Sequence, residues 1–194
     1  TEGKQHMSDV SNASRTLLMN LETLDYDEEL LALWNIPRCM LPSIVDTSRI
    51  YGYCEGLFDC QIPICSIVGD QQAALFGQTC FKAGDVKNTY GTGCFLLMNT
   101  EEHIIHSKNG LVTSVGWRIN GKVNYVLEGS VFIAGAAVQW LRDGLKIIRS
   151  ANESEERAYL VEDNEGVYVV PSFTGLGAPY WKPHVKGAIY GLTR

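Results

Sequence analysis

The sequence predicts a mixed α/β fold, with helices and a strand in the first part and an antiparallel meander in the second. An apolar run at 62–68 ends at a Gly-Asp pair, and a small-residue pattern that suits a helix continues over 70–80. Further along, Asn120-Gly121 separates two strand-like segments, which is typical of a type I′ hairpin turn. The character changes from helix to meander near 79–87, and we expect the domain boundary there.

Composition excludes several classes of protein. With 194 residues, 45% of them hydrophobic, the chain is long enough to bury a core as one domain or two small ones. The formal net charge of -6 argues against nucleic acid as a partner, because binding phosphates needs clustered Lys and Arg. No apolar run approaches membrane-spanning length, and the first residues lack the layout of a signal peptide. We therefore expect a cytoplasmic protein without a membrane span.

The cysteines and histidines predict neither disulfides nor a metal site. None of the six cysteines belongs to a Cys-x-x-Cys pair, and the four histidines do not accompany them at ligand spacing. Without a secretory signal, the cysteines are interpreted as reduced thiols.

The first 80 residues predict two short helices and a buried strand. Residues 11–14 offer cap side chains for the first helix, and the acidic turn 27–29 suits the N-terminus of the second. Residues 30–34 would form the apolar face of that second helix, which Pro37 ends. The apolar run 62–68 predicts a strand that is buried on both faces.

The remaining residues predict a meander, a helix and a later strand. The strands are expected at 94–99, 110–119 and 122–128, with the tight turn at Asn120-Gly121. Helical spacing follows over 131–148, and a strand over 166–171. The Gly-rich segment 173–181 predicts a structured loop, anchored by the burial of its last two residues, Tyr180 and Trp181.

Asp70 is the first candidate for chemistry, and two interpretations of it are open. It could be a helix N-cap, with Gly69 supplying the turn. Alternatively, it lies at the carboxyl end of a buried strand, where open α/β sheets place ligands, and could take a proton from a substrate hydroxyl. The neighbouring Gln71 and Gln72 suit polyols, because an amide can both donate to and accept from a hydroxyl.

A glycine-bounded threonine is the second candidate. In Gly91-Thr92-Gly93, the two glycines would let backbone amides approach an anion, and the hydroxyl of Thr92 could donate to a phosphate oxygen. The segment does not match a Walker A loop, and a bare Gly-x-Gly also occurs in many tight turns. Phe95 follows it, either as part of a strand core or as an apolar surface for the carbon edge of a polyol.

Gly135 and Gln139 are the third candidate. They lie one turn apart on the same face of the expected helix. Close packing is the simpler explanation of Gly135, which lies in a run of small residues.

Taken together, these segments resemble the FGGY family of carbohydrate kinases over essentially the whole chain, and within it the members that phosphorylate glycerol. The segments that carry the resemblance are SNASRT (11–16), GDQQAALFGQ (69–78), KNTYGTGCFLLMNT (87–100), NYVLEGSVFIAGAAVQWLRD (124–143), VYVVPSFTGLGAPYW (167–181) and GAIYGLTR (187–194). The resemblance implies two ribonuclease-H-like domains of the actin and hexokinase type. Residues 1–79 would be the end of the first domain and 80–194 the beginning of the second.

The resemblance also implies an activity, ATP-dependent phosphorylation of glycerol to sn-glycerol 3-phosphate with Mg²⁺ neutralising the phosphates. Asp70 would be the catalytic base and, with Gln71 and Phe95, would bind the substrate. Thr92 would bind the nucleotide, together with Gly135 and Gln139. The complete protein would be a homodimer or a homotetramer.

The sequence departs from the family pattern in two respects. It lacks the family's N-terminal phosphate loop, its Arg-Glu clamp for glycerol and its C-terminal adenine site, so we expect a fragment that is inactive alone. The segment 54–61 corresponds to a regulatory loop, but it contains neither the Arg that binds fructose 1,6-bisphosphate nor the phosphorylated His found in relatives. Both controls are therefore expected to be absent.

Two other functions remain open at this stage. A sibling FGGY kinase could act on another polyol or sugar, although Gln71 and Phe95 favour glycerol. A non-catalytic nucleotide- or polyol-binding module could retain the fold, and the presence of Asp70 counts against it.

Overall fold

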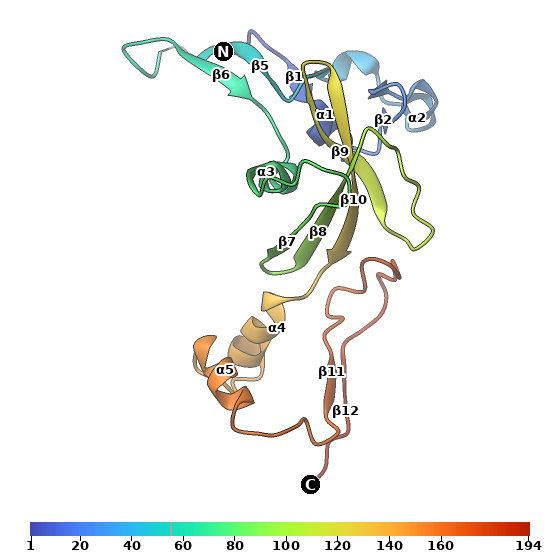
Figure 1. The fold of residues 1–194 in the computed structure, drawn as a ribbon. Helices are drawn as coiled ribbons and strands as arrows, with labels where there is room; N and C mark the ends of the chain where they lie inside the picture. Colours follow the sequence, from blue (N-terminus) through green and yellow to red (C-terminus); the bar gives the residue numbers. More distant parts are fainter. Residues whose placement is uncertain (55) are drawn as a thin grey trace. The chain divides into compact units, whose positions relative to one another are not determined.

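The computed structural model describes residues 1–54 and 56–194 and divides the chain into two compact units (Figure 1). The first unit contains residues 1–87, 97–107 and 112–128, and the second contains 88–96, 108–111 and 129–194. Three strands begin in one unit and end in the other, namely β7 (Val86–Tyr90), β8 (Cys94–Glu101) and β10 (Lys122–Val131). At these three points the chain passes from one unit to the other within a strand.

The architecture is mixed α/β, as the sequence predicts. One four-stranded sheet has the strand order β7-β8-β10-β9, and four two-stranded sheets pair β1 with β4, β2 with β3, β5 with β6 and β11 with β12. The further elements of the first unit are β1 (Met7–Asp9), α1 (Val10–Ala13), β2 (Met19–Asn20), β3 (Asp25–Tyr26), α2 (Glu28–Leu33), a 3₁₀ turn (Arg38–Met40), β4 (Ser43–Val45), β5 (Ser48–Cys54), β6 (Ile62–Ser66), α3 (Asp70–Gly77) and β9 (Val112–Ile119).

Both N-terminal helices form, but their caps differ from the expected ones. α1 is capped by Asp9, whose carboxylate accepts from the backbone N–H groups of residues 11 and 12. α2 is capped by Asp27, which was expected inside its first turn. The expected apolar face of α2 is wrong in part: Leu31 is buried, but Leu33 is 73% exposed, because the helix ends after fewer than two turns.

The prediction of a strand buried on both faces is wrong. β6 forms within the expected run, but it pairs antiparallel with β5 in a two-stranded sheet, and most of its side chains are exposed. The faces of a two-stranded ribbon are buried only where other elements pack on them, so an apolar composition alone does not bury β6. The segment 54–61 connects these strands; Glu55 within it lies outside the described residues.

The three strands of the expected meander form, but their order in the sheet differs from the prediction, because β8 pairs with β10 and not with β9. β9 and β10 pair antiparallel around Asn120 and Gly121, which have φ values of 52° and 76°. Positive φ at both central residues is what a type I′ turn requires. The sheet packs against α3 through a core cluster whose buried members are Leu75, Cys80, Leu97, Trp117 and Val126. A second cluster joins α1 to β9 and β10 through Val10, Ala13, Met19, Val115 and Tyr125.

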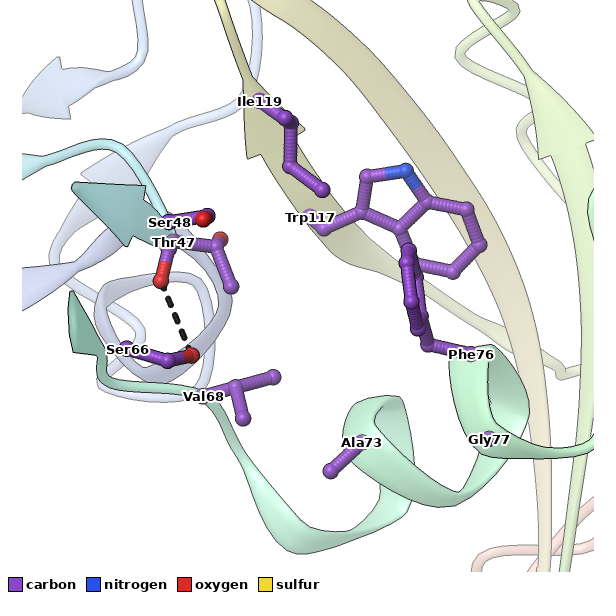
Figure 2. A pocket seen from close by; sticks show the side chains of 9 residues that line it. All are labelled: Thr47, Ser48, Ser66, Val68, Ala73, Phe76, Gly77, Trp117 and Ile119. Atoms are coloured by element: carbon purple, nitrogen blue, oxygen red, sulfur yellow. Dashed lines mark hydrogen bonds between the residues drawn. The ribbon is translucent and has the colours of Figure 1, made fainter.

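Thr47 joins three distant segments of the first unit. Its hydroxyl donates to Asp9 Oδ2 at 2.7 Å and accepts from the backbone N–H of Arg118 at 3.1 Å. Its backbone N–H donates to the Arg118 carbonyl at 2.8 Å. Its own carbonyl accepts from the Ser66 hydroxyl at 3.1 Å and from the backbone N–H of Ile67 at 3.2 Å (Figure 2). Thr47 therefore connects the end of β1, β9 and the end of β6.

The second unit contains α4 (Gly135–Gln139), a π-helical turn (Trp140–Gly144), α5 (Asn152–Ala158), β11 (Tyr168–Val170) and β12 (Ala188–Tyr190). The helix expected over 131–148 is therefore shorter than predicted. The backbone N–H groups of Ala134 and Gly135 donate to the carbonyls of Thr92 and Gly91, and this pairing delays the start of the helix until Gly135. The strand expected at 166–171 forms as β11.

The loop at 173–181 is anchored differently from the prediction. Tyr180 is exposed, so it does not anchor the loop by burial. Trp181 is also exposed in part, but its indole N–H donates to the Gly110 carbonyl and its ring contacts Phe132 edge-on. No helix in the described part of the chain is long and apolar enough to cross a membrane.

Candidate functional site

Asp70 is the first residue of α3, and the cap position belongs to Gly69. The carboxylate is exposed, and Oδ1 accepts from the backbone N–H of Gln71 at 2.8 Å. Oδ2 lies 3.4 Å from Gln71 Nε2. An N-cap side chain usually accepts from the backbone N–H group two or three residues further along the helix. No side-chain bond of this kind caps the start of α3. The N-cap interpretation therefore does not account for Asp70.

Gln71 is half-buried beside Asp70 and contacts a lysine on the neighbouring sheet. The ammonium of Lys87, on β7, donates to Gln71 Oε1. Lys87 itself is 6% exposed. Burial lowers the pKa of its ammonium, while the negative charges of Glu128 and Asp70 act to raise it. Gln71 thus lies between a buried cation and an exposed carboxylate.

The charged groups behind Gln71 were not predicted from the sequence. Glu128 on β10 is 3% exposed, and both of its oxygens receive a bond from the Arg15 guanidinium, at 3.0 and 3.1 Å. A signal was available in the sequence, because the acid directly follows the apolar residues 125–127 of the expected strand, and a buried charge needs a partner. Together, Lys87, Glu128 and Arg15 form a charged group beneath the Asp70–Gln71 pair.

A second buried acid positions the residue before Asp70. Asp9 is fully buried and its Oδ1 accepts from the Ser11 hydroxyl at 2.9 Å. The Ser11 oxygen in turn accepts from the backbone N–H of Gly69 at 2.9 Å. A Cβ on Gly69 would lie 2.4 Å from Oε1 of the buried Gln72, so the Gln72 amide would have to move to admit a side chain there. The start of α3 is therefore held by a hydrogen bond to Ser11 of α1.

In the second unit, the structure brings Thr92, Gly135 and Gln139 together. They line a pocket of 420 Å³ whose lining residues are Gly91, Thr92, Gly135, Val138, Gln139, Arg142, Ala151, Asn152, Ser154 and Glu155. Gly91 and Gly93 close the turn between β7 and β8 with a 2.9 Å bond from Gly91 N to Gly93 O. The hydroxyl of Thr92 and the amide of Gln139 are both exposed, as contact with a ligand requires.

Gly135 and Gly93 are small for a packing reason as well. A Cβ on Gly135 would lie 2.7 Å from the Gly91 carbonyl oxygen. A Cβ on Gly93 would lie 2.4 Å from the Val131 carbonyl oxygen. Gly135 therefore allows the start of α4 to approach the β7–β8 turn, and Gly93 allows that turn to approach the end of β10. This supports the packing explanation of Gly135 without excluding a contact with a ligand.

Phe95 belongs to the second unit, on β8, and is half-buried. It is not among the residues that line the pocket with Thr92. Asp70 and Gln71 belong to the first unit. The predicted site residues thus form two local groups, with Asp70 and Gln71 in one and Thr92, Gly135 and Gln139 in the other.

A separate pocket of 250 Å³ flanks α3 (Figure 2). Phe76 and Ala73 contribute from the helix, and Trp117 and Ile119 contribute from β9. Phe76 and Trp117 meet edge-on, with ring centroids 5.2 Å apart. The lining contains no charged side chain, so this pocket is not suited to a phosphate.

The metal-ligating side chains are dispersed. Among residues 1–54 and 56–194, no group of three or more His, Cys, Asp or Glu side chains could hold a metal ion. The six cysteines form no disulfide in the structure, and their reduced state stays a prediction.

Comparison with known proteins identifies the relatives of this chain. A family model for the N-terminal domain of the FGGY family of carbohydrate kinases matches residues 1–77. The model for the C-terminal domain of the same family matches residues 86–194. The chain is 58% identical to the glycerol kinase of Brevibacillus brevis and 60% identical to glycerol kinase 2 of Thermotoga maritima. Each of these matches covers 100% of this chain and 39% of the relative.

Solved structures agree with this fold. A crystal structure of Plasmodium falciparum glycerol kinase with ADP has a TM-score of 0.83 at 40% sequence identity, covering 96% of this chain and 38% of that chain. A ligand-bound xylulose kinase from Lactobacillus acidophilus has a TM-score of 0.80 at 21% identity, covering 96% and 39%. The second likeness concerns the fold alone. The predicted ribonuclease-H-like fold of the FGGY kinases is thereby confirmed.

Proposed function

The chain belongs to the FGGY family of carbohydrate kinases, and on that premise we propose that it forms the central part of an ATP-dependent kinase that phosphorylates glycerol to sn-glycerol 3-phosphate. The chain spans 39% of the length of the glycerol kinases it matches, so the activity is assigned to the complete protein. The observation that carries the proposal is the exposed Asp70 carboxylate at the start of α3, with the Gln71 amide beside it. A carboxylate of this kind can accept the proton of an attacking hydroxyl.

In the proposed mechanism, each unit contributes one group of residues. Asp70 accepts the proton of the glycerol hydroxyl that attacks the γ-phosphate, and Gln71 binds a glycerol hydroxyl. Phe95 packs against the carbon edge of glycerol. Thr92 donates its hydroxyl to a nucleotide phosphate, while Gly135 and Gln139 contact the nucleotide in the 420 Å³ pocket. Phosphoryl transfer requires mainly this positioning, together with stabilisation of charge.

Mg²⁺ fits the donors that are present. Mg²⁺ is usually held by one or two carboxylates, substrate phosphates and water. The exposed Asp70 offers one such carboxylate, with Oδ2 engaged only at 3.4 Å by Gln71. When bound, the ion would neutralise the phosphate charge that develops during transfer.

The test is the variant Asp70→Asn in the complete protein. The amide is close in shape to the carboxylate but cannot accept the proton, so we expect glycerol-dependent ADP formation to fall about 10²- to 10⁴-fold. Nucleotide affinity, measured by calorimetry, should stay within about twofold of the wild type. Turnover that survives the substitution would remove Asp70 from the role of base and would favour a different mechanism.

The alternatives make different predictions. A sibling FGGY kinase would show its highest kcat/KM on another polyol or sugar when the complete wild-type protein is tested against a substrate panel. A non-catalytic binding module would show no turnover with any substrate, before or after substitution of Asp70. The homodimer or homotetramer, the cytoplasmic location and the absence of both regulatory controls stay predictions.

A further inference from the structure

The Gln71 amide lies between a group that can only donate and a group that can only accept. Lys87 Nζ donates to Gln71 Oε1 on one side. On the other side, Gln71 Nε2 lies 3.4 Å from Asp70 Oδ2. An ammonium carries no acceptor and an ionised carboxylate carries no donor. Rotating the amide by 180° would therefore place its NH₂ against the ammonium and its oxygen against the carboxylate.

We propose that Lys87 is a positioning residue that fixes the orientation of the Gln71 amide, so that Gln71 donates to the substrate hydroxyl while Asp70 accepts from it. This inference deepens the proposed function and rests on it.

Lys87 is suited to this role because its own position is restricted. It lies on β7, within the four-stranded sheet, and its side chain is buried. The negative charge of Glu128 acts on the ammonium, and Glu128 is itself buried and bonded to Arg15. A surface lysine would exchange such a bond readily with water, since exposed pairs contribute little. A buried lysine is shielded from that exchange, so its bond to the Gln71 amide oxygen is more persistent.

The fixed orientation has a consequence for substrate class. A hydroxyl can donate one proton and accept at the same oxygen, so it can satisfy Asp70 and Gln71 together. A carbonyl or carboxylate oxygen could accept from Gln71 but would have no proton for Asp70. The pair therefore selects an alcohol over an aldehyde or an acid with the same carbon skeleton.

The experiment compares variants of the complete protein by the KM for glycerol, kcat, the KM for ATP and the melting temperature. Lys87→Met keeps the aliphatic stem and removes the donor, and we expect the KM for glycerol to rise about tenfold with kcat and the KM for ATP nearly unchanged. Lys87→Arg retains a donor and should recover most of the loss. Lys82→Met is the matched control, because Lys82 is an exposed lysine in the segment between α3 and β7. It should leave all four quantities unchanged.

A double substitution separates positioning from a direct or purely structural role. If Lys87 acts through Gln71, then Lys87→Met should change the KM for glycerol less than about twofold in a Gln71→Ala background. The same factor in both backgrounds would overturn the inference.

The polarity of Gln71 is tested without any change at Lys87, so a folding defect in Lys87→Met leaves the inference falsifiable. Gln71→Glu replaces the donating NH₂ by an acceptor that faces Asp70, and it should raise the KM for glycerol more than Gln71→Ala does. Near wild-type KM in Gln71→Glu would show that the side chain accepts from the substrate, contrary to the inference. If the wild type acts on another polyol, the proposed substrate is wrong, and the same variants test Lys87 with that polyol. Absence of turnover on every polyol refutes the proposed function, and with it this inference.

Discussion

We expect the stability of the first unit to depend on the ion pair between Arg15 and Glu128, because the Glu128 carboxylate is buried. Arg15 gives Glu128 two bonds, at 3.0 and 3.1 Å, and the carboxylate is 3% exposed. The substitution Arg15→Met keeps most of the aliphatic stem but leaves the buried charge without its guanidinium. Removing one partner of a buried pair costs about 3–5 kcal/mol. We expect about 3 kcal/mol here, at the lower end, because Arg15 is partly exposed and the Lys87 ammonium still acts on Glu128.

A matched control exists on the surface of the same unit. Arg38 contacts Asp25 at 2.6 Å and Glu28 at 2.9 Å, but these acids are 53% and 72% exposed. Water replaces the guanidinium there, so Arg38→Met should leave the free energy of unfolding nearly unchanged. The two variants thus remove the same guanidinium group and differ in the burial of its partner.

The assay is urea unfolding of the complete protein, with the midpoint compared at constant slope. Arg15→Met should lower the midpoint clearly and Arg38→Met should not. Equal shifts for the two arginine variants would refute the reasoning from burial.

Three further changes test other parts of the structure. Ser11→Ala leaves the Gly69 N–H without its acceptor, so hydrogen exchange at that amide should accelerate and kcat should fall; unchanged protection would show that Ser11 does not hold the start of α3. Gly135→Ala places a Cβ 2.7 Å from the Gly91 carbonyl, and we expect the KM for ATP, but not for glycerol, to rise about tenfold in steady-state kinetics, whereas equal rises would argue against a nucleotide role. The pKa of Asp27 is lowered, first by its bond from the Asn20 side chain, so the stabilisation is complete above the unfolded pKa and is lost as pH falls through the folded one. Acid unfolding below about pH 4 should therefore be less steep in Asp27→Asn, and identical acid curves would contradict this assignment.

Local sequence patterns predicted the elements whose conformation depends on their own residues. The Asn120-Gly121 turn forms because both residues adopt positive φ, which their side chains permit. α3 forms because a Gly-Asp start precedes small, helix-compatible residues. The β9–β10 pair follows directly from that turn.

Properties that depend on distant partners could not be predicted in this way. The apolar run at 62–68 gave no information about which faces of β6 would be covered, since that depends on β5 and on other layers. In the sequence, Lys87 is one of several charged residues before the Gly91-Thr92-Gly93 turn, and its neighbours do not indicate that it is buried. Lys87 is buried because of its position in the folded sheet. The negative charge that favours its ammonium there belongs to Glu128, which is 41 residues away in the chain. Similarly, the role of Ser11 depends on Gly69, which approaches it only in the folded unit.

The junction at Thr47 has a consequence for the order of assembly. Its bonds reach Asp9, Ser66 and Arg118 at separations of 38, 19 and 71 residues. Three loops must close before a single threonine can satisfy all of these groups, and closure entropy is lost before any bond is gained. The β5–β6 ribbon can pair earlier, because its strands are close in sequence. We therefore expect the hydrogen bonds of Thr47 to form after the transition state for folding, so that Thr47→Val accelerates unfolding while the folding rate barely changes.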